Sequence, residues 1–159
     1  MQDAAFFEEQ KMDQRWLIFI QFALLGGLSV CSLVLIFYSR VNPLLGSIPF
    51  LSILACILLF RTIRLQTAIT KEYIGYRFLP LQRSFRQILR SDVADVQIKT
   101  YDAIMEYGGW GIRIGKHGKA FTMKGNHAIM ITLKSQKHIL IGTARPEEAL
   151  RALSVNGYL

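Results

Sequence analysis

The chain has 159 residues and carries 19 Lys/Arg against 11 Asp/Glu, a net charge of +8. This length accommodates a membrane segment and one compact domain, but not a second globular domain of ordinary size. The two cysteines lie inside apolar runs and form no CxxC motif or disulfide framework, which argues against cysteine-based metal or redox chemistry.

The first long apolar run is Trp16–Tyr38, which contains no charged residue. About 20 such residues suffice for a helix to cross the hydrocarbon layer of a bilayer. A cleaved signal peptide is the rival interpretation, but residues 1–15 carry four acidic residues against two basic ones, and the run is longer than a typical signal core. The pattern predicts an N-terminal segment over 1–15, followed by a retained membrane-spanning helix over 16–38.

A second, shorter apolar run follows at 44–60 and contains Pro49, which can kink a helix. We expect it to pair with the first run as a two-helix transmembrane hairpin over 16–60. Arg40 alone marks the connecting loop, whereas several cations flank the outer ends of the hairpin. The positive-inside rule therefore predicts that both termini are cytoplasmic. The flanking cations are Lys11, Arg15, Arg61, Arg64, Lys71 and Arg77.

The remainder, 61–159, carries sixteen Lys/Arg against seven Asp/Glu and changes to short alternating apolar stretches bounded by turn residues. This pattern predicts a mainly-β domain. Pro146 and the following acids favour a C-terminal helix over 146–154 that caps the domain. The eight expected strands are Leu65–Thr70, Tyr73–Phe78, Ser84–Leu89, Val93–Tyr101, Gly111–Ile114, Ala120–Lys124, Ala128–Leu133 and His138–Gly142.

Three blocks of this domain carry a resemblance to a known group. They are Glu106–Arg113, the Gly125–Asn126 turn, and Ile139–Thr143 running into Arg145–Glu148. With the hairpin, they make the chain similar to membrane-anchored bacterial PH-like domain proteins. The resemblance implies two transmembrane helices, a PH-like β-barrel with one capping helix, and a multi-pass location in the bacterial inner membrane. It supports the fold more than any activity.

Glycines at 108, 109 and 111 surround Trp110, but they match neither a GxGxxG nor a Walker pattern. They predict positive φ angles or a bulge that lets the Trp110 indole pack at the barrel rim. The histidines have no metal-ligand spacing, and no carboxylate is paired with a nucleophile in a known signature. We therefore expect a non-enzymatic protein with no catalytic, cofactor-binding or metal-binding residues. The residues weighed are His117, His127, His138, Asp92, Asp95, Asp102 and Glu106.

Basic side chains of the β domain form the candidate interaction surface. Attraction to anionic lipid headgroups is one interpretation, while solvated strand faces and the positive-inside bias are the simpler ones. A protein partner or a homo-oligomer also fits, whereas the chain lacks the signatures of nucleic-acid-binding folds. The surface comprises Arg83, Arg86, Arg90, Trp110, Arg113, Lys116, Lys119 and Lys124.

The functional hypothesis is a membrane-anchored PH-like module that mediates protein or anionic-lipid contacts at the cytoplasmic membrane face. One alternative is an accessory subunit of a larger membrane or envelope complex, with Gln21 and small residues packing against partner helices. Another alternative is an enzyme on a lipid or nucleotide substrate that uses Asp102, Glu106 or a histidine.

Overall fold

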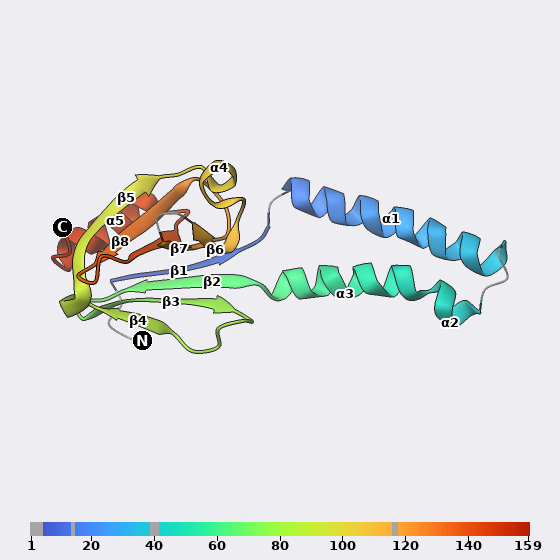
Figure 1. Cartoon of the computed structure of the whole chain (residues 1–159), viewed down its shortest axis with the longest axis horizontal. Helices are drawn as coiled ribbons and strands as arrows, with labels where there is room; N and C mark the ends of the chain where they lie inside the picture. Colours follow the sequence, from blue (N-terminus) through green and yellow to red (C-terminus); the bar gives the residue numbers. More distant parts are fainter. Residues whose placement is uncertain (1–4, 14, 39–41, 116–117) are drawn as a thin grey trace. The chain divides into compact units, whose positions relative to one another are not determined.

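The computed structural model describes residues 5–13, 15–38, 42–115 and 118–159 (Figure 1). Its contacts divide the chain into two units. The sheet unit combines the N-terminal part of the chain up to Lys11 with Ile63–Leu159, and the helical unit is Met12–Thr62. The helical unit is therefore an insertion within the sequence of the sheet unit.

The helical unit contains α1 (Arg15–Phe37), α2 (Pro43–Gly46) and α3 (Ile48–Thr62), and α1 packs against α3. With 23 residues, α1 is apolar and long enough to cross a membrane. At 1.5 Å per residue, the 15 residues of α3 extend only about 22 Å. Among the described residues, α1 is thus the one helix of spanning length, and the predicted second span over 44–60 is not a single helix.

The break between α2 and α3 has a local cause at Pro49. Its ring nitrogen has no hydrogen to donate to the carbonyl four residues earlier, so the regular helical ladder is interrupted there. Ser47 bridges the gap, because its N–H donates to Pro43 O at 3.1 Å and its carbonyl accepts from Leu51 N at 3.0 Å. The chain consequently stays helical on both sides of a short irregularity.

The first sheet of the sheet unit has four antiparallel strands in the order β1-β2-β3-β4. The N-terminal strand β1 lies at one edge and pairs with β2, so Phe6↔Ile69 and Lys11↔Arg64 are opposite each other. The sequence predicts a separate N-terminal segment for this stretch, whereas the structure makes it part of the sheet. The strands are β1 (Phe6–Lys11), β2 (Arg64–Ile69), β3 (Tyr73–Leu79) and β4 (Arg86–Leu89).

The second sheet has five strands in the order β5-β8-β9-β7-β6, and a short 3-10 helix, η1 (Arg90–Asp92), leads into it from β4. Strands β7 and β9 are parallel, and the other neighbours are antiparallel. In the described parts of the chain no ladder joins the edges of the two sheets, so the expectation of a closed barrel is wrong. The strands are β5 (Val93–Thr100), β6 (Gly111–Gly115), β7 (Gly118–Thr122), β8 (His127–Leu133) and β9 (His138–Gly142).

A hydrophobic core lies between the two sheets. Tyr76 of β3 packs on Phe121 of β7 with ring centroids 4.6 Å apart, and Leu65 and Ile141 are fully buried. The C-terminal helix α5 (Pro146–Val155) contacts β1 and β2 of the first sheet as well as β5 and β8 of the second. The predicted C-terminal helix is confirmed, and it bridges the two sheets.

A second, smaller core covers the opposite face of the second sheet. Side chains alternate between faces along a strand, so Ala120 and Leu140 point away from the inter-sheet core that holds Phe121. They pack with Tyr101 and with Ala103 of α4 (Ala103–Tyr107), a helix that the sequence analysis did not predict. The described part of the sheet unit therefore has two α-helices, where the sequence predicts a single capping helix.

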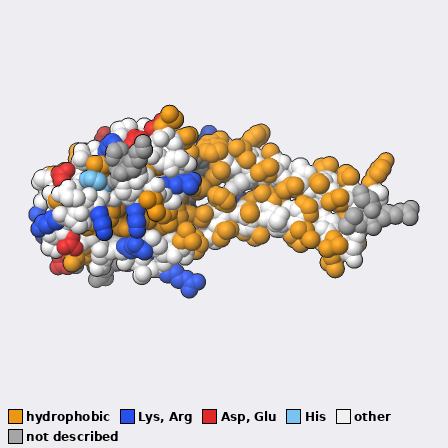
Figure 2. Space-filling model, viewed as in Figure 1, with side chains coloured by type: hydrophobic (Ala, Val, Ile, Leu, Met, Phe, Trp, Pro, Cys, Tyr) orange, Lys and Arg blue, Asp and Glu red, His pale blue; other side chains and the backbone are white. Residues whose placement is uncertain are grey.

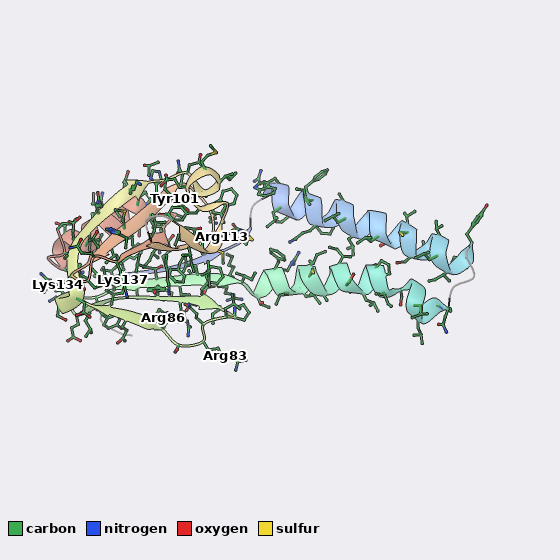
Figure 3. All side chains as sticks on the ribbon, viewed as in Figure 1. Arg83, Arg86, Tyr101, Arg113, Lys134 and Lys137 are labelled. Carbon is green, nitrogen blue, oxygen red and sulfur yellow. The ribbon has the colours of Figure 1, made fainter. Side chains whose placement is uncertain are left out.

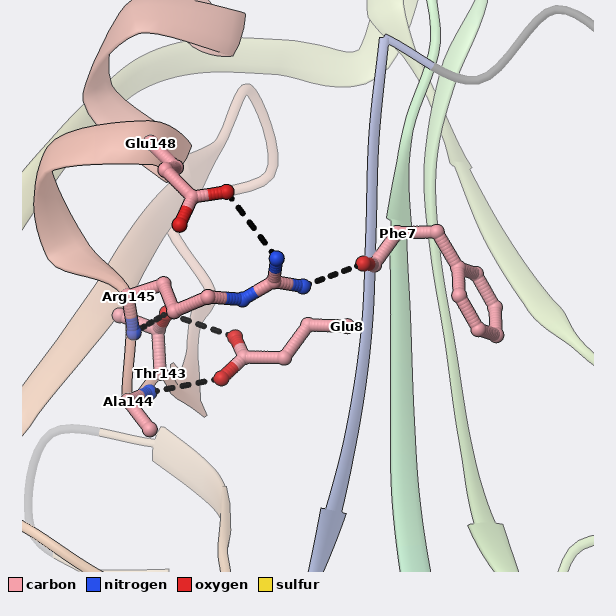
Figure 4. Close-up of polar contacts among 6 residues, drawn as sticks. All are labelled: Phe7, Glu8, Thr143, Ala144, Arg145 and Glu148. Atoms are coloured by element: carbon pink, nitrogen blue, oxygen red, sulfur yellow. Dashed lines mark hydrogen bonds and ion pairs between the residues drawn. The ribbon is translucent and has the colours of Figure 1, made fainter.

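Strand β1 is held to the segment before α5 by polar contacts (Figure 4). Glu8 is only 3% exposed, and its carboxylate accepts hydrogen bonds from Thr143 Oγ1 at 2.7 Å and Ala144 N at 2.9 Å. Arg145 donates to the carbonyl of Phe7 and lies over the ring of Phe6. The strand that precedes the helical unit is thus an integral part of the fold, with every second side chain buried.

Candidate interaction surface

The basic residues of the predicted surface lie on several elements of the sheet unit. Arg86 begins β4, Arg113 is on β6 and Lys119 is on β7, while Arg83 lies in the β3–β4 loop. Figure 2 shows Lys and Arg side chains spread over one face of the sheet unit, and Figure 3 labels several of them in the same view. Lys116 lies outside the described residues.

Arg86 lies on the edge strand of the first sheet, next to the inter-sheet core. It is exposed and lies directly opposite Tyr76 across the β3–β4 ladder, so both side chains share the core-facing side. Burial raises the pKa of the Tyr76 hydroxyl, and the nearby Arg86 guanidinium opposes that rise. A solvent-exposed cation therefore lies close to the hydroxyl of a buried tyrosine.

Lys119 occupies a corresponding place on the second sheet. It is exposed, it is paired with Ile114 on one side and Ile139 on the other, and it precedes core-facing Phe121 by two residues. Ile114 is 83% exposed, an unusual state for a large apolar side chain on a strand. Lys137 is exposed and lies at the same strand end, immediately before β9. We call Arg86, Ile114, Lys119 and Lys137 the basic rim.

The structure separates two further members of the predicted set from this rim. Arg113 pairs with Ala120, so its side chain lies on the α4 side of the second sheet. Arg90 donates to the carbonyls of Asn156 and Gly157 and lies 5.2 Å from the centre of the Tyr158 ring. Its guanidinium fastens the C-terminal residues to η1, which is a structural role within the sheet unit.

Trp110 lies partly buried against the smaller core, and its Nε1 donates to Gly125 O at 3.2 Å. The flanking glycines have φ angles of 69° at Gly108, 117° at Gly109 and 114° at Gly111. The prediction of positive φ angles around Trp110 is confirmed. Because other residues reach these angles only with strain, the glycines let the chain leave α4 and turn the indole back onto the sheet. Lys124 is half-buried just after β7 and also has contacts within the fold.

An open groove of about 440 Å³ lies beside α4, and its lining includes Tyr101, Asp102, Glu106 and Trp110. Both carboxylates are engaged in holding α4. Asp102 accepts from the first-turn N–H groups of Ile104 and Met105, both at 2.9 Å, and Glu106 accepts from Asp102 N at 3.0 Å. These carboxylates therefore act as helix caps.

The sequence pattern does not reveal several structurally important residues. Glu8 and Gln10 are buried in β1, and Gln10 Nε2 donates to Gly142 O at 2.7 Å. Their alternation with exposed Glu9 has the period of a strand, but the inward positions are polar and so resemble solvent-exposed sequence. Lys137 was missed because its position beside Lys119 depends on the parallel pairing of β7 with β9.

Among the residues that the structure describes, no group of three His, Cys, Asp or Glu side chains could hold a metal ion. The two cysteines are exposed free thiols on the helices of the helical unit. No model of a known protein family matches the chain, and no match is found among curated proteins.

Proposed function

We propose that this chain is a two-pass membrane protein whose sheet unit presents a non-enzymatic, PH-like interaction surface to an anionic bilayer. The observation that carries the proposal is the pairing of β1 with β2. Lys11 and Arg64 are opposite each other in this ladder, although the whole helical unit separates them in sequence. If α1 crosses a bilayer, the chain must cross back before Arg64, because paired strands lie on one side.

The return crossing falls to α2 and α3. With Ser47 between them, these helices span Pro43–Thr62, which is 20 residues. A helical path of this length covers about 30 Å, the thickness of a typical hydrocarbon layer. The helical unit also exposes many large apolar side chains, including Phe19 at 75%, and they cover the face seen in Figure 2. Lipid is the solvent that such a surface fits.

The position of β1 also argues against removal of α1 as a signal peptide. Cleavage after α1 would remove Glu8 and Gln10 together with the contacts that they make to Gly142, Thr143 and Ala144. The first sheet would lose an edge strand, and buried polar groups would lose their partners. A retained anchor is consistent with an intact sheet unit.

The basic rim supplies the electrostatic part of the proposal. Each Lys or Arg close to an anionic leaflet contributes about 1 kcal/mol of attraction. Arg86, Lys119 and Lys137 are exposed, and Ile114 adds an apolar side chain that can enter the headgroup layer. The cations next to the outer ends of the helical unit, including Lys11, Arg61 and Arg64, favour a cytoplasmic sheet unit at a bacterial inner membrane by the positive-inside rule.

Thiol accessibility in cells tests the two-pass topology. Cys31 and Cys56 are replaced by alanine, and single cysteines are introduced at Phe7, Leu44 or Val155. We expect a membrane-impermeant maleimide to label position 44 in cells with a permeabilised outer membrane. Positions 7 and 155 should react only after the inner membrane is opened. Labelling of 7 and 155 from opposite sides, or of all three from one side, would refute the proposal.

Hydrogen exchange tests the lipid contact. The full chain is reconstituted in zwitterionic vesicles with and without anionic phospholipid. Anionic lipid should slow exchange in β6 and β7 but leave α5 unchanged, and Lys119→Glu should abolish the slowing. Equal exchange rates in the two kinds of vesicle would contradict a role for the basic rim.

A second candidate, an accessory subunit of a membrane complex, has one observation in its favour. A cavity of about 280 Å³ on the helical unit is lined by Ser29, Ser32 and Ser47 together with apolar side chains. Ser32 is 6% exposed, and its hydroxyl has no hydrogen-bond partner among the described residues. Small polar residues at such a place favour the packing of another helix. Native mass spectrometry that finds only monomers would argue against this candidate.

A further inference from the structure

The β3–β4 loop, Pro80–Phe85, lies at a particular end of the first sheet. It follows Leu79, which is opposite Arg64 in the β2–β3 ladder, and Arg64 is opposite Lys11 in the β1–β2 ladder. Lys11 and Arg64 are also the positions next to which the chain enters and leaves the helical unit. The loop therefore emerges from the strand end to which both helical connections are attached.

The loop exposes an apolar side chain beside a cation. Leu81 is 75% exposed, and Arg83 is exposed and points away from the sheets in Figure 3. Phe78 and Ile88, on the adjoining strands, are buried, so the sequence here places a large apolar group outward although the core is close by. An exposed leucine next to an arginine is the composition of a segment that enters the headgroup region.

The loop is held in this conformation by contacts with its own strand. Gln82 N donates to Phe78 O at 2.7 Å, and Arg77 donates to the carbonyl of Arg83 at 3.2 Å. The Arg77 guanidinium lies 4.6 Å from the centre of the Phe85 ring. These contacts occupy the backbone of the loop and leave the side chains of Leu81 and Arg83 outside.

Further cations lie at the same strand end. The side chain of Lys11 is 54% exposed and that of Arg64 is 41% exposed, although both make ion pairs with Glu9. One carboxylate thus faces two cations, and Arg83 adds a third positive charge at this end. The excess of positive charge matches a surface of anionic headgroups.

We propose that the Pro80–Phe85 loop is a further membrane contact, separate from the helical unit, in which Leu81 inserts at the interface and Arg83 binds lipid phosphate. This inference rests on the proposed membrane anchoring of the helical unit. With both helical connections attached at this strand end, the loop would meet the same leaflet and restrict rotation of the sheet unit about its connections.

Depth-dependent quenching tests the contact. In the full chain with Cys31 and Cys56 replaced by alanine, a fluorophore is attached to Leu81→Cys and the protein is reconstituted in phosphatidylcholine vesicles with or without phosphatidylglycerol. We expect lipids that carry a quencher near the headgroup to reduce the emission at position 81 at least twofold more than at Val155→Cys. Val155 is 78% exposed and suits the control because it lies near the opposite end of the first sheet. It immediately precedes Asn156, which accepts a hydrogen bond from Arg90. Arg90 follows Leu89, whose partner Tyr73 is at the end of β3 opposite to Leu79.

A second substitution tests the role of the cation. Arg83→Ala should weaken the quenching at position 81 in vesicles that contain phosphatidylglycerol and have little effect in pure phosphatidylcholine. Equal quenching at positions 81 and 155 would overturn the inference. Protection of position 81 from aqueous iodide without quenching from lipid would also overturn it, since that result indicates a protein contact.

A fluorophore at the native Cys31 separates the two proposals. Strong quenching there by lipids that carry a quencher deep in the acyl chains shows that α1 is inserted. Quenching at 31 without quenching at 81 then refutes only the loop contact. Absence of quenching at 31 refutes the membrane anchoring on which the loop contact depends.

Discussion

At the scale of single residues, buried polar side chains connect parts of the chain that are far apart in sequence. Glu8 and Thr143 are 135 positions apart, yet they share a buried hydrogen bond of 2.7 Å. On the outer face of the same sheet, Gln66 Nε2 donates to Glu9 Oε2 at 2.6 Å, and Arg77 Nε donates to Gln66 Oε1 at 2.6 Å. The hydrogen bond from Gln66 is the main cause that lowers the pKa of Glu9 below its usual value.

Glu8→Ala should destabilise the sheet unit by about 2 kcal/mol, because it leaves the Thr143 hydroxyl and the Ala144 N–H without their charged acceptor. Glu8→Gln keeps one carbonyl acceptor and should have a smaller effect. Lys11→Ala is the matched control on the same strand, since its side chain is 54% exposed and its ion pair contributes little. Denaturant unfolding followed by near-ultraviolet circular dichroism measures the three variants. Equal losses for Glu8→Ala and Lys11→Ala would contradict the structural role of Glu8.

At the scale of elements, the short helix α4 depends on its caps more than on its length. It has five residues, too few for intrinsic helix stability, and Gly108 ends it in the left-handed conformation. Asp102 and Glu106 satisfy N–H groups at its first turn, while Ala103 packs into the smaller core. The helix exists because side-chain caps and burial supply what local propensity lacks.

Asp102→Ala should therefore loosen α4 while the sheets remain folded. The loss of an N-cap of this kind costs about 1 kcal/mol, enough to raise the population of the open helix several-fold. Hydrogen exchange in Ala103–Tyr107 should become faster, with α5 unchanged. Asp95→Ala, which removes the same charge from an exposed position on β5, provides the control. If both variants leave exchange in α4 unaltered, the capping contacts do not stabilise the helix.

At the scale of the whole molecule, the sheet unit is assembled from the two chain segments that lie before and after a long insertion. Strand β1 precedes α1, but its partner β2 follows α3, so the first sheet is complete only after the helical unit has been made. The contacts of β1 with the segment before α5 are still more distant in sequence. Such non-local pairing slows folding, because a large loop must be closed before the contacts form.

The tyrosines of the sheet unit predict how its stability depends on pH. Burial raises the pKa of Tyr76, Tyr101, Tyr107 and Tyr158, and that of Tyr101 reaches about 12. Thr122 opposes the rise at Tyr101, although the two hydroxyls lack a partner of good hydrogen-bond geometry among the described residues. The folded protein keeps these protons at a pH where the unfolded chain, with ordinary values of 10.0, releases them.

The stabilising contribution of Tyr101 is fully present below pH 10 and is lost as the pH rises through about 12, and the other three phenols act in the same direction. We expect the free energy of unfolding to fall as the pH rises from 10 to about 12. The variant Tyr101→Phe should lack the phenolate transition with the highest pKa. Phenolate absorbance and denaturant midpoints, measured between pH 8 and 12 on the same samples, check this expectation. Ionisation of all tyrosines near their ordinary pKa in the folded protein would contradict it.

Much of the local structure follows from the sequence alone. Charge-free apolar residues over 16–38 predict α1, and period-two alternation predicts the eight strands β2–β9, most with boundaries within about two residues of those observed. Pro146 and two acids predict the start of α5, and the glycines around Trp110 predict its unusual backbone. These features depend on interactions between near neighbours, which the sequence shows directly.

Only the tertiary structure decided the partners of these elements. Strand β1 has polar inward positions, so its place in the first sheet depends on Thr143, Ala144 and Gly142, far along the chain. The parallel pairing of β7 with β9 and the division into two sheets likewise depend on long-range ladders. This pairing scatters the predicted basic residues: Arg86 and Lys119 lie exposed at the edge of the inter-sheet core, Arg113 lies on the α4 side and Arg90 makes a structural contact. The sequence by itself determined an apolar anchor and a basic, strand-rich unit, because composition and periodicity are local; which charges share a surface is set by non-local packing.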